Sequence, residues 1–151
     1  MKKTIAFCMM AAIITMFISC SKKSKSTTPA STMTATVGAK SFTSTSTGAV
    51  QGTIGGVNDL TITGKSDSIL IVIDVWGYNN AAGNFPIDIS ETSGTSTASY
   101  NPGSTLATQQ NAVHGNVTIT GVSGGVISGM FNFVASDSTS VSGGNFSVKP
   151  L

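Results

Sequence analysis

Short runs of alternating apolar and polar residues follow one another from about residue 32, separated by clusters of Gly, Asn, Asp and Ser. A period of two is typical of β-strands that bury one face, and such clusters favour turns. No stretch keeps the 3.6-residue period of an amphipathic helix. In the first half, the pattern predicts strands over residues 33–37, 42–45, 49–54, 60–63, 69–76 and 84–89.

Two of these strands have a predicted place in a sheet. Residues 69–76 are apolar on both phases, which indicates a central strand with both faces covered. The strand over 84–89 contains Pro86, which has no backbone N–H to donate. We therefore expect it at an edge or at the start of a strand.

The second half of the chain alternates more regularly. One face is expected to carry Val113, Gly115, Val117 and Ile119, and in the next strand the core face carries Ile127, Gly129, Phe131 and Phe133. Residues 121–125 between them predict a hairpin turn. Val141 is out of phase with residues 146–148 across Gly143 and Gly144, which indicates a β-bulge. The pattern predicts an all-β fold: an antiparallel β-sandwich or small closed β-barrel of about eight to ten strands.

Composition agrees with one such domain. The chain has 151 residues, 17 of them Gly, and only 9% are charged. That length favours a single core, and the composition excludes a mostly helical protein or a coiled coil.

The first 19 residues have the layout of a secretory signal peptide: Lys2 and Lys3, an apolar run over 4–18, and the small residue Ser19. The apolar run is shorter than the roughly 20 residues that span a bilayer. The sequence Phe-Ile-Ser-Cys at 17–20 resembles the lipobox of bacterial lipoproteins. In these proteins the cysteine receives a diacylglyceryl group, and the chain is cut just before it. We expect lipidation at Cys20 and acyl chains that anchor the protein to a membrane; an ordinary signal peptide is the alternative.

Residues 20–31 contain only Ser, Lys, Thr, Pro and Ala after the cysteine, which is typical of a flexible tether. The domain is therefore expected over 32–151. All eight basic residues are lysines, and five of them precede residue 32, whereas all six acids follow it. The formal charge of +2 thus reflects the leader and tether, and the domain itself is acidic. Without arginine or a lysine cluster in the domain, we expect no nucleic-acid partner.

The sequence offers no recognisable catalytic or metal-binding constellation. His114 stands alone on the polar phase of its strand, and a zinc site needs three or four ligands. Residues 121–125 match the G-x-S-x-G pattern, but no helix follows and the histidine comes first, so a turn is the better interpretation. Residues 64–66 lack the first glycine of a phosphate loop, because Asp59 stands there. We expect no catalytic residues, no metal and no cofactor.

Two groups of residues keep other interpretations open. Asp74 could pair with Asp88 or Glu91 in a hydrolase, but an outward-facing Asp74 beside Trp76 is favoured. Large aromatic side chains can line a ligand site or cap an open core. The candidate ligand contacts are Trp76, Tyr78 and Tyr100.

The lipobox, the tether, Thr-Val-Gly-Ala-Lys-Ser-Phe at 36–42, Thr-Ile-Thr-Gly at 61–64 and the closing hairpin over 126–148 together resemble small lipoproteins of Bacteroidota. These are families of unknown function with an all-β domain. The resemblance implies an envelope location, here at the outer membrane. Whether the domain faces the periplasm or the cell surface stays open.

The same organisms glycosylate Asp-Ser/Thr motifs, which Asp-Ser-Ile at 67–69 and Asp-Ser-Thr at 137–139 resemble. The resemblance implies O-glycosylation at Ser68 and Ser138. Plain turn sequences are the alternative, because Asp and Ser favour turns on their own.

From these observations we expect a membrane-anchored, non-enzymatic domain that binds a glycan, a small apolar ligand or an envelope protein. A structural or adhesion protein of the envelope is the alternative, and a carboxylate-dependent hydrolase is the third candidate.

Overall fold

The structure, a computed structural model, describes residues 31–103 and 106–151. The expected signal peptide, Cys20 and all but the last residue of the tether lie outside the described residues. None of the described helices is long and apolar enough to cross a membrane.

The described residues form ten strands and one short 3-10 helix. In chain order these are β1 (Thr32–Val37), β2 (Lys40–Thr43), β3 (Ser46–Ile54), β4 (Val57–Lys65), β5 (Ile69–Trp76), β6 (Gly83–Pro86), β7 (Ser96–Pro102), η1 (Leu106–Thr108), β8 (Gln110–Ser123), β9 (Val126–Ala135) and β10 (Ser140–Val148).

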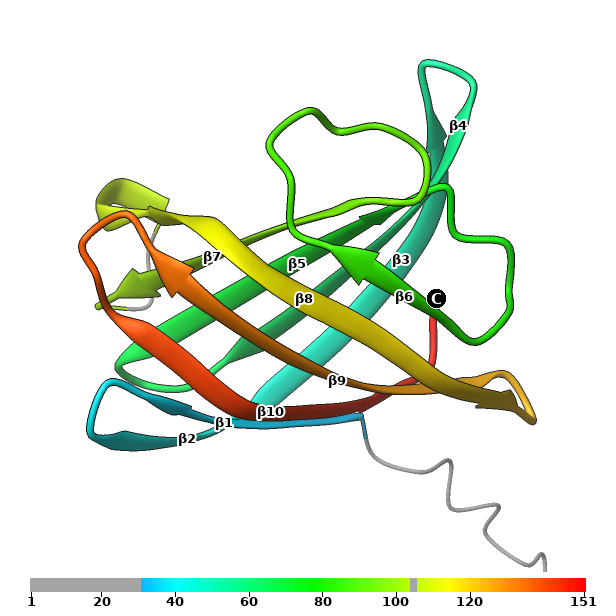
Figure 1. The fold of residues 1–151 in the computed structure, drawn as a ribbon. Helices are drawn as coiled ribbons and strands as arrows, with labels where there is room; N and C mark the ends of the chain where they lie inside the picture. Colours follow the sequence, from blue (N-terminus) through cyan, green and yellow to red (C-terminus); the bar gives the residue numbers. More distant parts are fainter. Residues whose placement is uncertain (1–30, 104–105) are drawn as a thin grey trace, which may run out of the picture.

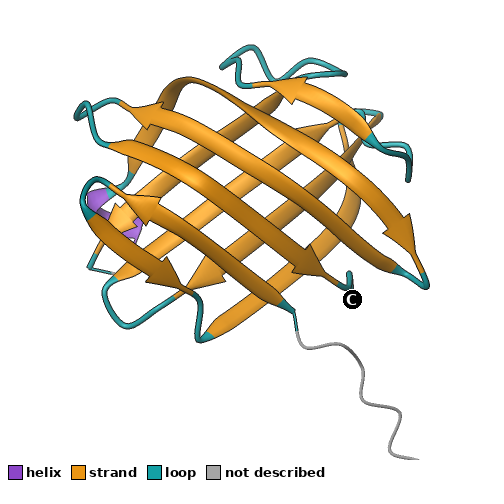
Figure 2. Cartoon of the chain, turned by 60° about the horizontal axis from the view of Figure 1, so that its bottom comes forward, coloured by secondary structure: helices purple, strands orange, loops and turns teal. Residues whose placement is uncertain are grey.

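The strands pair antiparallel in the order β2-β1-β10-β9-β8-β7-β5-β4-β3, and β6 pairs with β8 beside this path. The sheet curls round on itself into a half-barrel (Figures 1 and 2). The predicted all-β class is confirmed. The predicted edge position of the proline-containing strand agrees with β6, which pairs with β8 alone among the named strands.

Ser44 and Thr45 connect the two edges of the curled sheet. The Ser44 N–H donates to the carbonyl of Met33 in β1, and the Thr45 N–H donates to the carbonyl of Lys65 in β4. Across this seam, Met33 packs directly on Gly64, where a Cβ would lie 2.5 Å from the Met33 sulfur. The edges therefore meet through side-chain packing and a two-residue connection.

One buried cluster lines the inside of the curl, and β5 shows how it is built. Ile69, Ile71, Ile73 and Val75 are buried on the inner phase, whereas Leu70, Val72 and Asp74 are only half-buried on the outer phase. Both faces of residues 69–76 were expected to be covered. The inner face is fully covered, whereas the outer face is covered only in part.

The predicted core face of β9 is confirmed, because Ile127, Gly129, Phe131 and Phe133 are all buried. The predicted bulge in β10 is confirmed as well. Its register shifts between Val141 and Gly144, and Gly143 has a φ of +59°. The hairpin between β8 and β9 turns at Gly124 and Gly125, whose φ values of +60° and +76° suit a two-residue turn.

Val113 corrects the prediction for β8. The alternation predicts it on one face with Val117 and Ile119, which are buried, but Val113 is 56% exposed. The register shifts between Ala112 and His114, so Ala112 takes the buried position in place of Val113. His114 is exposed, as its polar phase indicates.

Candidate functional site

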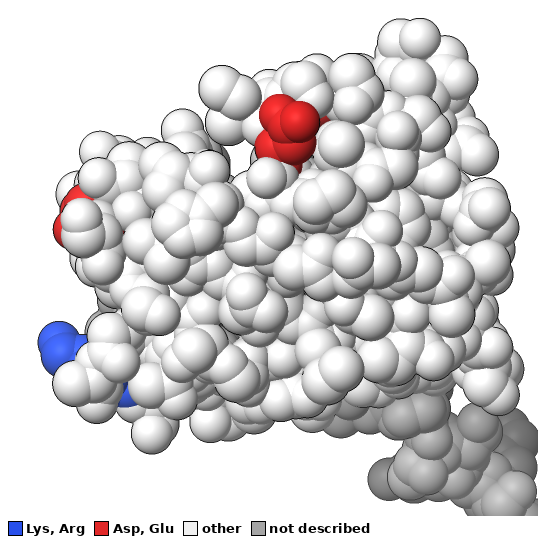
Figure 3. Space-filling model, viewed as in Figure 1, with Lys and Arg blue, Asp and Glu red and all other residues white. Residues whose placement is uncertain are grey.

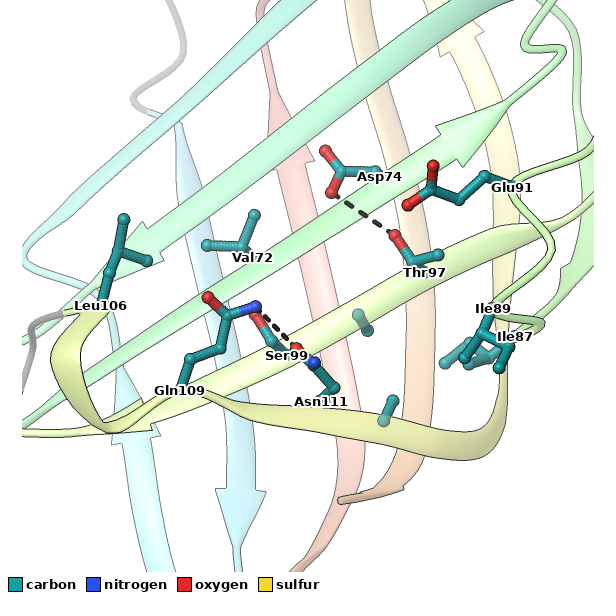
Figure 4. A pocket seen from close by; sticks show the side chains of 12 residues that line it. Val72, Asp74, Ile87, Ile89, Glu91, Thr97, Ser99, Leu106, Gln109 and Asn111 are labelled. Atoms are coloured by element: carbon teal, nitrogen blue, oxygen red, sulfur yellow. Dashed lines mark hydrogen bonds between the residues drawn. The ribbon is translucent and has the colours of Figure 1, made fainter. Parts of the chain in front are cut away.

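A groove of about 440 Å³ lies on the outer side of β5 and β7, at the point where β7 and β8 separate (Figure 4). These two strands pair only at Ser99–Asn111 and Tyr100–Gln110. Beyond that point β8 pairs with β6 instead. The groove is lined by β5, β7, the start of β8, η1 and the loop over 87–91.

The loop that forms one wall of the groove is held by backbone hydrogen bonds. The Ile87 N–H donates to the carbonyl of Gly115 at 3.0 Å, and the Asp88 N–H donates to that of Ser96 at 2.9 Å. At the other end, the Gly94 N–H donates to the carbonyl of Trp76 at 2.8 Å. Bonds at both ends fix this wall against the sheet.

The lining of the groove combines acids, neutral polar groups and aliphatic side chains. Asp74 and Glu91 lie at one end, with Thr97 next to Asp74, and Gln109 and Asn111 lie toward the other (Figure 4). The apolar part of the lining includes Val72, Ile87, Ile89 and Leu106. Among the described residues that line the groove, none is Lys, Arg or His. Two carboxylates therefore face it without a cationic neighbour in its lining.

The structure separates the three acids proposed from the sequence. Asp74 faces outward from β5, as favoured, and shares the groove with Glu91. Asp88 does not line the groove; it is exposed, and its Oδ1 accepts a hydrogen bond from the backbone N–H of Ser90 at 2.9 Å. Of the two proposed partners for Asp74, only Glu91 shares this groove.

A chain of polar contacts crosses the outer face from β4 to β7. The Thr61 hydroxyl lies 2.7 Å from Asp74 Oδ1 and 3.1 Å from Asp59 Oδ2. The Thr97 hydroxyl lies 3.5 Å from Asp74 Oδ2. Burial raises the pKa of Asp59, the hydroxyl of Thr61 acts against this, and the negative charges of Asp74 and Glu91 raise it further. Asp59 therefore holds its proton to higher pH than an ordinary aspartate does.

A second cleft, of about 320 Å³, lies where the β3–β4 hairpin meets the residues that follow β5. Its floor is formed by the buried residues Asp59 and Tyr78. Asp59 Oδ1 and the Tyr78 hydroxyl are both buried without a hydrogen-bond partner in the described part of the chain. The exposed side chains at its rim are Gln51, Thr53, Asn58 and Asn80.

Residues 29–148 match the model of a family described as Domain of unknown function (DUF6252). The chain belongs to this family. The matched region contains all ten described strands and the residues that line both depressions. No curated protein and no solved structure matches the chain.

In this DUF6252 domain Tyr100 lies apart from Trp76 and Tyr78, the other two aromatic residues proposed as ligand contacts. Tyr78 is at the floor of the second cleft, and Trp76 is 9% exposed and contributes to neither depression. Tyr100 pairs with Ile71, five residues along β5 from Trp76, which is about 17 Å in an extended strand. The structure therefore does not bring Tyr100 to Trp76 and Tyr78.

The Tyr100 hydroxyl is engaged at the other end of the sheet. It donates to Asp137 Oδ2 and lies 3.0 Å from the Thr139 hydroxyl. Burial raises the pKa of Tyr100, and its hydrogen bond to Asp137 raises it further. The same hydroxyl lowers the pKa of Asp137. Tyr100 thus fastens the β9–β10 turn to β7.

Ser68 and Ser138, the residues proposed for O-glycosylation, are both exposed in turns, between β4 and β5 and between β9 and β10. Ser68 and Thr139 line a common cleft with Tyr100, so the two turns lie at the same end of the domain. Glycosylation of either serine stays a prediction.

Charged side chains are sparse on the face seen in Figure 3, where acidic atoms gather over the loop between β6 and β7 and a basic group lies near the β1–β2 hairpin. Within residues 31–103 and 106–151, no group of three or more His, Cys, Asp and Glu side chains is placed to hold a metal ion.

Sequence reasoning missed several residues of the two depressions. Asp59 shares the outer phase of β4 with Thr61, whereas the apolar residues Leu60 and Ile62 are buried. The alternation along this strand therefore already indicated that the Asp59 side chain faces outward. Thr97 and Ser99 gave no such signal, because no strand was predicted over β7.

Proposed function

We propose that this chain is a lipid-anchored protein of the bacterial envelope, held at the outer membrane through Cys20, whose DUF6252 domain binds a ligand without catalysing a reaction. The lipobox-like sequence and the tether support the anchor. The groove on the outer face carries the binding proposal, because none of the described residues that line it carries a positive charge to pair with its two carboxylates.

The chemistry of the groove favours a basic segment of an envelope protein as its ligand. Asp74 and Glu91 favour Lys or Arg, and Ile89 and Leu106, which are 81% and 64% exposed, offer apolar contact beside them. A purely apolar ligand would desolvate the carboxylates without replacing their hydrogen bonds to water. A neutral glycan could bond the carboxylates, but none of the described residues that line the groove carries an aromatic ring for it to stack on.

Filling the groove should abolish binding. In Thr97→Trp, an indole replaces a half-buried hydroxyl beside Asp74. We expect at least a tenfold loss of affinity, or about 1.4 kcal/mol. The measurement is a titration of the full chain in detergent with short Lys- and Arg-containing peptides that also carry Leu or Ile. Neutral glycans and acyl lipids serve as comparison ligands.

The matched control is Thr36→Trp, at an exposed position of β1. It should bind as the unsubstituted chain does, and added salt should weaken binding by both proteins. Equal affinity of the Thr97 and Thr36 variants would reject the groove as the site. If the protein binds neutral glycans or acyl lipids but none of the basic peptides, a basic segment is rejected as the ligand.

A carboxylate-dependent hydrolase is the second candidate, because Asp74 and Glu91 line one groove. It requires that a bound glycan be cleaved, that Glu91→Gln abolish cleavage, and that Asp88→Asn leave it intact. A structural or adhesion role, the remaining alternative, needs no occupied groove and would be unaffected by Thr97→Trp.

The anchor has a direct test in the intact mass of the protein extracted from the membranes of its source cells. We expect a chain that starts at Cys20 and carries diacylglyceryl and acyl additions, and hexose additions if Ser68 and Ser138 are glycosylated. In Cys20→Ser the lipid additions and the membrane association should both be lost, because no other residue of the tether can be acylated in this way. A membrane-bound Cys20→Ser variant would contradict lipid anchoring at this position.

A further inference from the structure

The chain enters the domain at one end of the curled sheet. Thr32, the first residue of β1, pairs with Ser147 near the end of β10. The hydroxyl of Ser31 accepts a hydrogen bond from the backbone N–H of Lys149 at 3.3 Å. The expected tether over residues 20–31 therefore joins the domain beside the last residues of β10, and we call this end the tether end.

Segments that are far apart in the sequence meet at the tether end (Figure 1). A depression of about 250 Å³ is shared by β3, the loop after β5, the β8–β9 hairpin and the residues after β10. Gln51 Nε2 donates to Asn80 Oδ1 at 2.8 Å, and the Leu151 N–H donates to the carbonyl of Ala49 at 3.2 Å. The β1–β2, β4–β5 and β9–β10 turns gather at the opposite end, where they line a common cleft.

The surface segments of the tether end are almost uncharged. They are the two hairpin turns, the loop after β5 and the residues after β10, which cover 55–56, 124–125, 77–82 and 149–151. Lys149 is the one charged residue in these segments. The turns at the opposite end contain or adjoin four charged residues, which are Lys40, Lys65, Asp67 and Asp137. The two ends of the domain therefore differ in how readily they would leave water.

Exposed apolar side chains stand beside the turns of the tether end. Ile54 immediately precedes the turn of the β3–β4 hairpin and is 55% exposed, and Val122, near the end of β8, is 38% exposed. Leu151 is fully exposed. Single exposed apolar residues are common on protein surfaces. Here, however, three of them lie at the nearly uncharged end to which the lipid anchor would be attached, and this coincidence indicates a surface that they contact.

A bilayer fits this end better than a protein partner does. A stable protein interface buries about 800 Å² on each partner, through closely matched surfaces. The tether end instead presents apolar side chains on separate segments around a depression. The boundary between lipid headgroups and acyl chains accepts such side chains, and anionic headgroups attract Lys149 and the lysines of the tether.

The length of the tether makes a weak contact sufficient. As a flexible coil, residues 20–31 would have an r.m.s. length of about 18 Å, whereas a domain of this size is about 35 Å across. The anchor would thus keep the tether end close to the bilayer. A short flexible linker gives an effective concentration in the millimolar range, so a contact that fails to hold an untethered domain can hold this one.

We propose that the tether end docks on the bilayer that holds the acyl chains, with Ile54, Val122 and Leu151 at the boundary between headgroups and acyl chains. This inference rests on the proposed anchor at Cys20 and adds a second contact with the membrane. The docked domain leaves the groove open, because η1 at one end of the groove follows β7 toward the opposite end of the domain. There the Gly103 N–H donates to the carbonyl of Ser68 at 2.9 Å.

The test places a fluorescent label on the lipidated chain in vesicles of phosphatidylethanolamine and phosphatidylglycerol that contain nitroxide-labelled lipids. Cys8 would leave with the signal peptide and Cys20 would be acylated, so an introduced cysteine supplies the free thiol of the mature chain. We expect lipid quenching to be at least twofold stronger for labels in Ile54→Cys and Val122→Cys than in Ala39→Cys. Ala39 is the matched control, because it is exposed in a turn at the opposite end.

A charged substitution separates docking by the protein from attraction of the label itself. With the label at residue 54, Val122→Glu should reduce quenching at least twofold, whereas Met130→Glu, at a residue of β9 that is 49% exposed, should leave it unchanged. Vesicle sedimentation reports on the anchor independently. A chain that sediments with vesicles but shows equal quenching at the three positions overturns docking and leaves the anchor intact, as does quenching that Val122→Glu leaves unchanged. A chain that does not sediment overturns both.

Discussion

Gly129→Ala should lose about 3 kcal/mol of stability or more. Gly129 in β9 pairs with Phe146 in β10, whose ring lies over the glycine. A Cβ would meet that ring and would lie 2.5 Å from the backbone carbonyl oxygen of Thr118 in β8. The ring can rotate, but the carbonyl cannot retreat without distorting the pairing of β8 with β9. Overpacking of this kind typically costs about 1–3 kcal/mol and occasionally more.

The measurement is the free energy of unfolding from urea titration, followed by circular dichroism. Gly48→Ala is the matched control, because it also places a methyl group in a strand, with no atom within 4 Å and an ordinary φ. It should change stability by less than about 1 kcal/mol. A Gly129→Ala variant as stable as Gly48→Ala would mean that Phe146 does not pack on β9 as described.

Much of this closing hairpin was predictable, but the role of Gly129 was not. The phase of β9 placed Gly129 on the core face, and the phase change across Gly143 placed the bulge in β10. That Gly129 must lack a side chain depends on Phe146, which the register of two strands brings opposite it. Register across strands is a property of the assembled sheet, and the alternation within one strand does not contain it.

β7 was missed for a related reason. Ser-Thr-Ala-Ser-Tyr-Asn-Pro over 96–102 contains little of the apolar alternation typical of a strand. It is nevertheless paired with β5 over seven residues, and small side chains at Ser96 and Ala98 fit the crowded inner face. Tertiary pairing overrides weak local propensity here, and the groove that depends on β7 could not be foreseen.

The acids and aromatic residues show the same limit. The phase of β5 correctly turned Asp74 outward. Glu91 reaches the same groove because its loop is bonded at both ends and because Glu91 itself has a φ of +52°. The path of such a loop does not follow from residue types. The separation of Tyr100 from Tyr78 likewise follows from strand pairing.

Asp59→Asn should remove a pH-dependent loss of stability that the unsubstituted protein shows. Thr61 has one hydroxyl hydrogen and two carboxyl groups in reach, and the shorter contact, 2.7 Å, goes to Asp74. The same hydroxyl also lies 3.1 Å from Asp59 Oδ2, and this weaker contact favours the ionised form of Asp59. Burial of Asp59, the largest effect, and the charges of Asp74 and Glu91 outweigh that contact and favour the protonated form, which is why the pKa of Asp59 is raised.

The sign of the pH dependence follows from this. An acid with a raised pKa binds more protons in the folded state than in the unfolded state, so its contribution to stability is complete below the ordinary value of 3.8 and is lost as pH rises through the native pKa. Each tenfold weakening of the acid on folding corresponds to about 1.4 kcal/mol. Asp137 has a lowered pKa, so it acts in the other direction and at pH below 3.8.

The side-chain amide introduced by Asp59→Asn would imitate the protonated acid, because it is neutral and puts no charge into the buried site beside Asp74. The free energy of unfolding, measured from pH 4 to pH 8, should therefore fall less steeply in Asp59→Asn than in the unsubstituted protein, and the variant should be the more stable of the two at pH 7. Asp88→Asn, which removes an exposed carboxylate that lines neither depression, should leave the slope unchanged. Parallel pH profiles for the unsubstituted protein and Asp59→Asn would mean that Asp59 is ionised throughout.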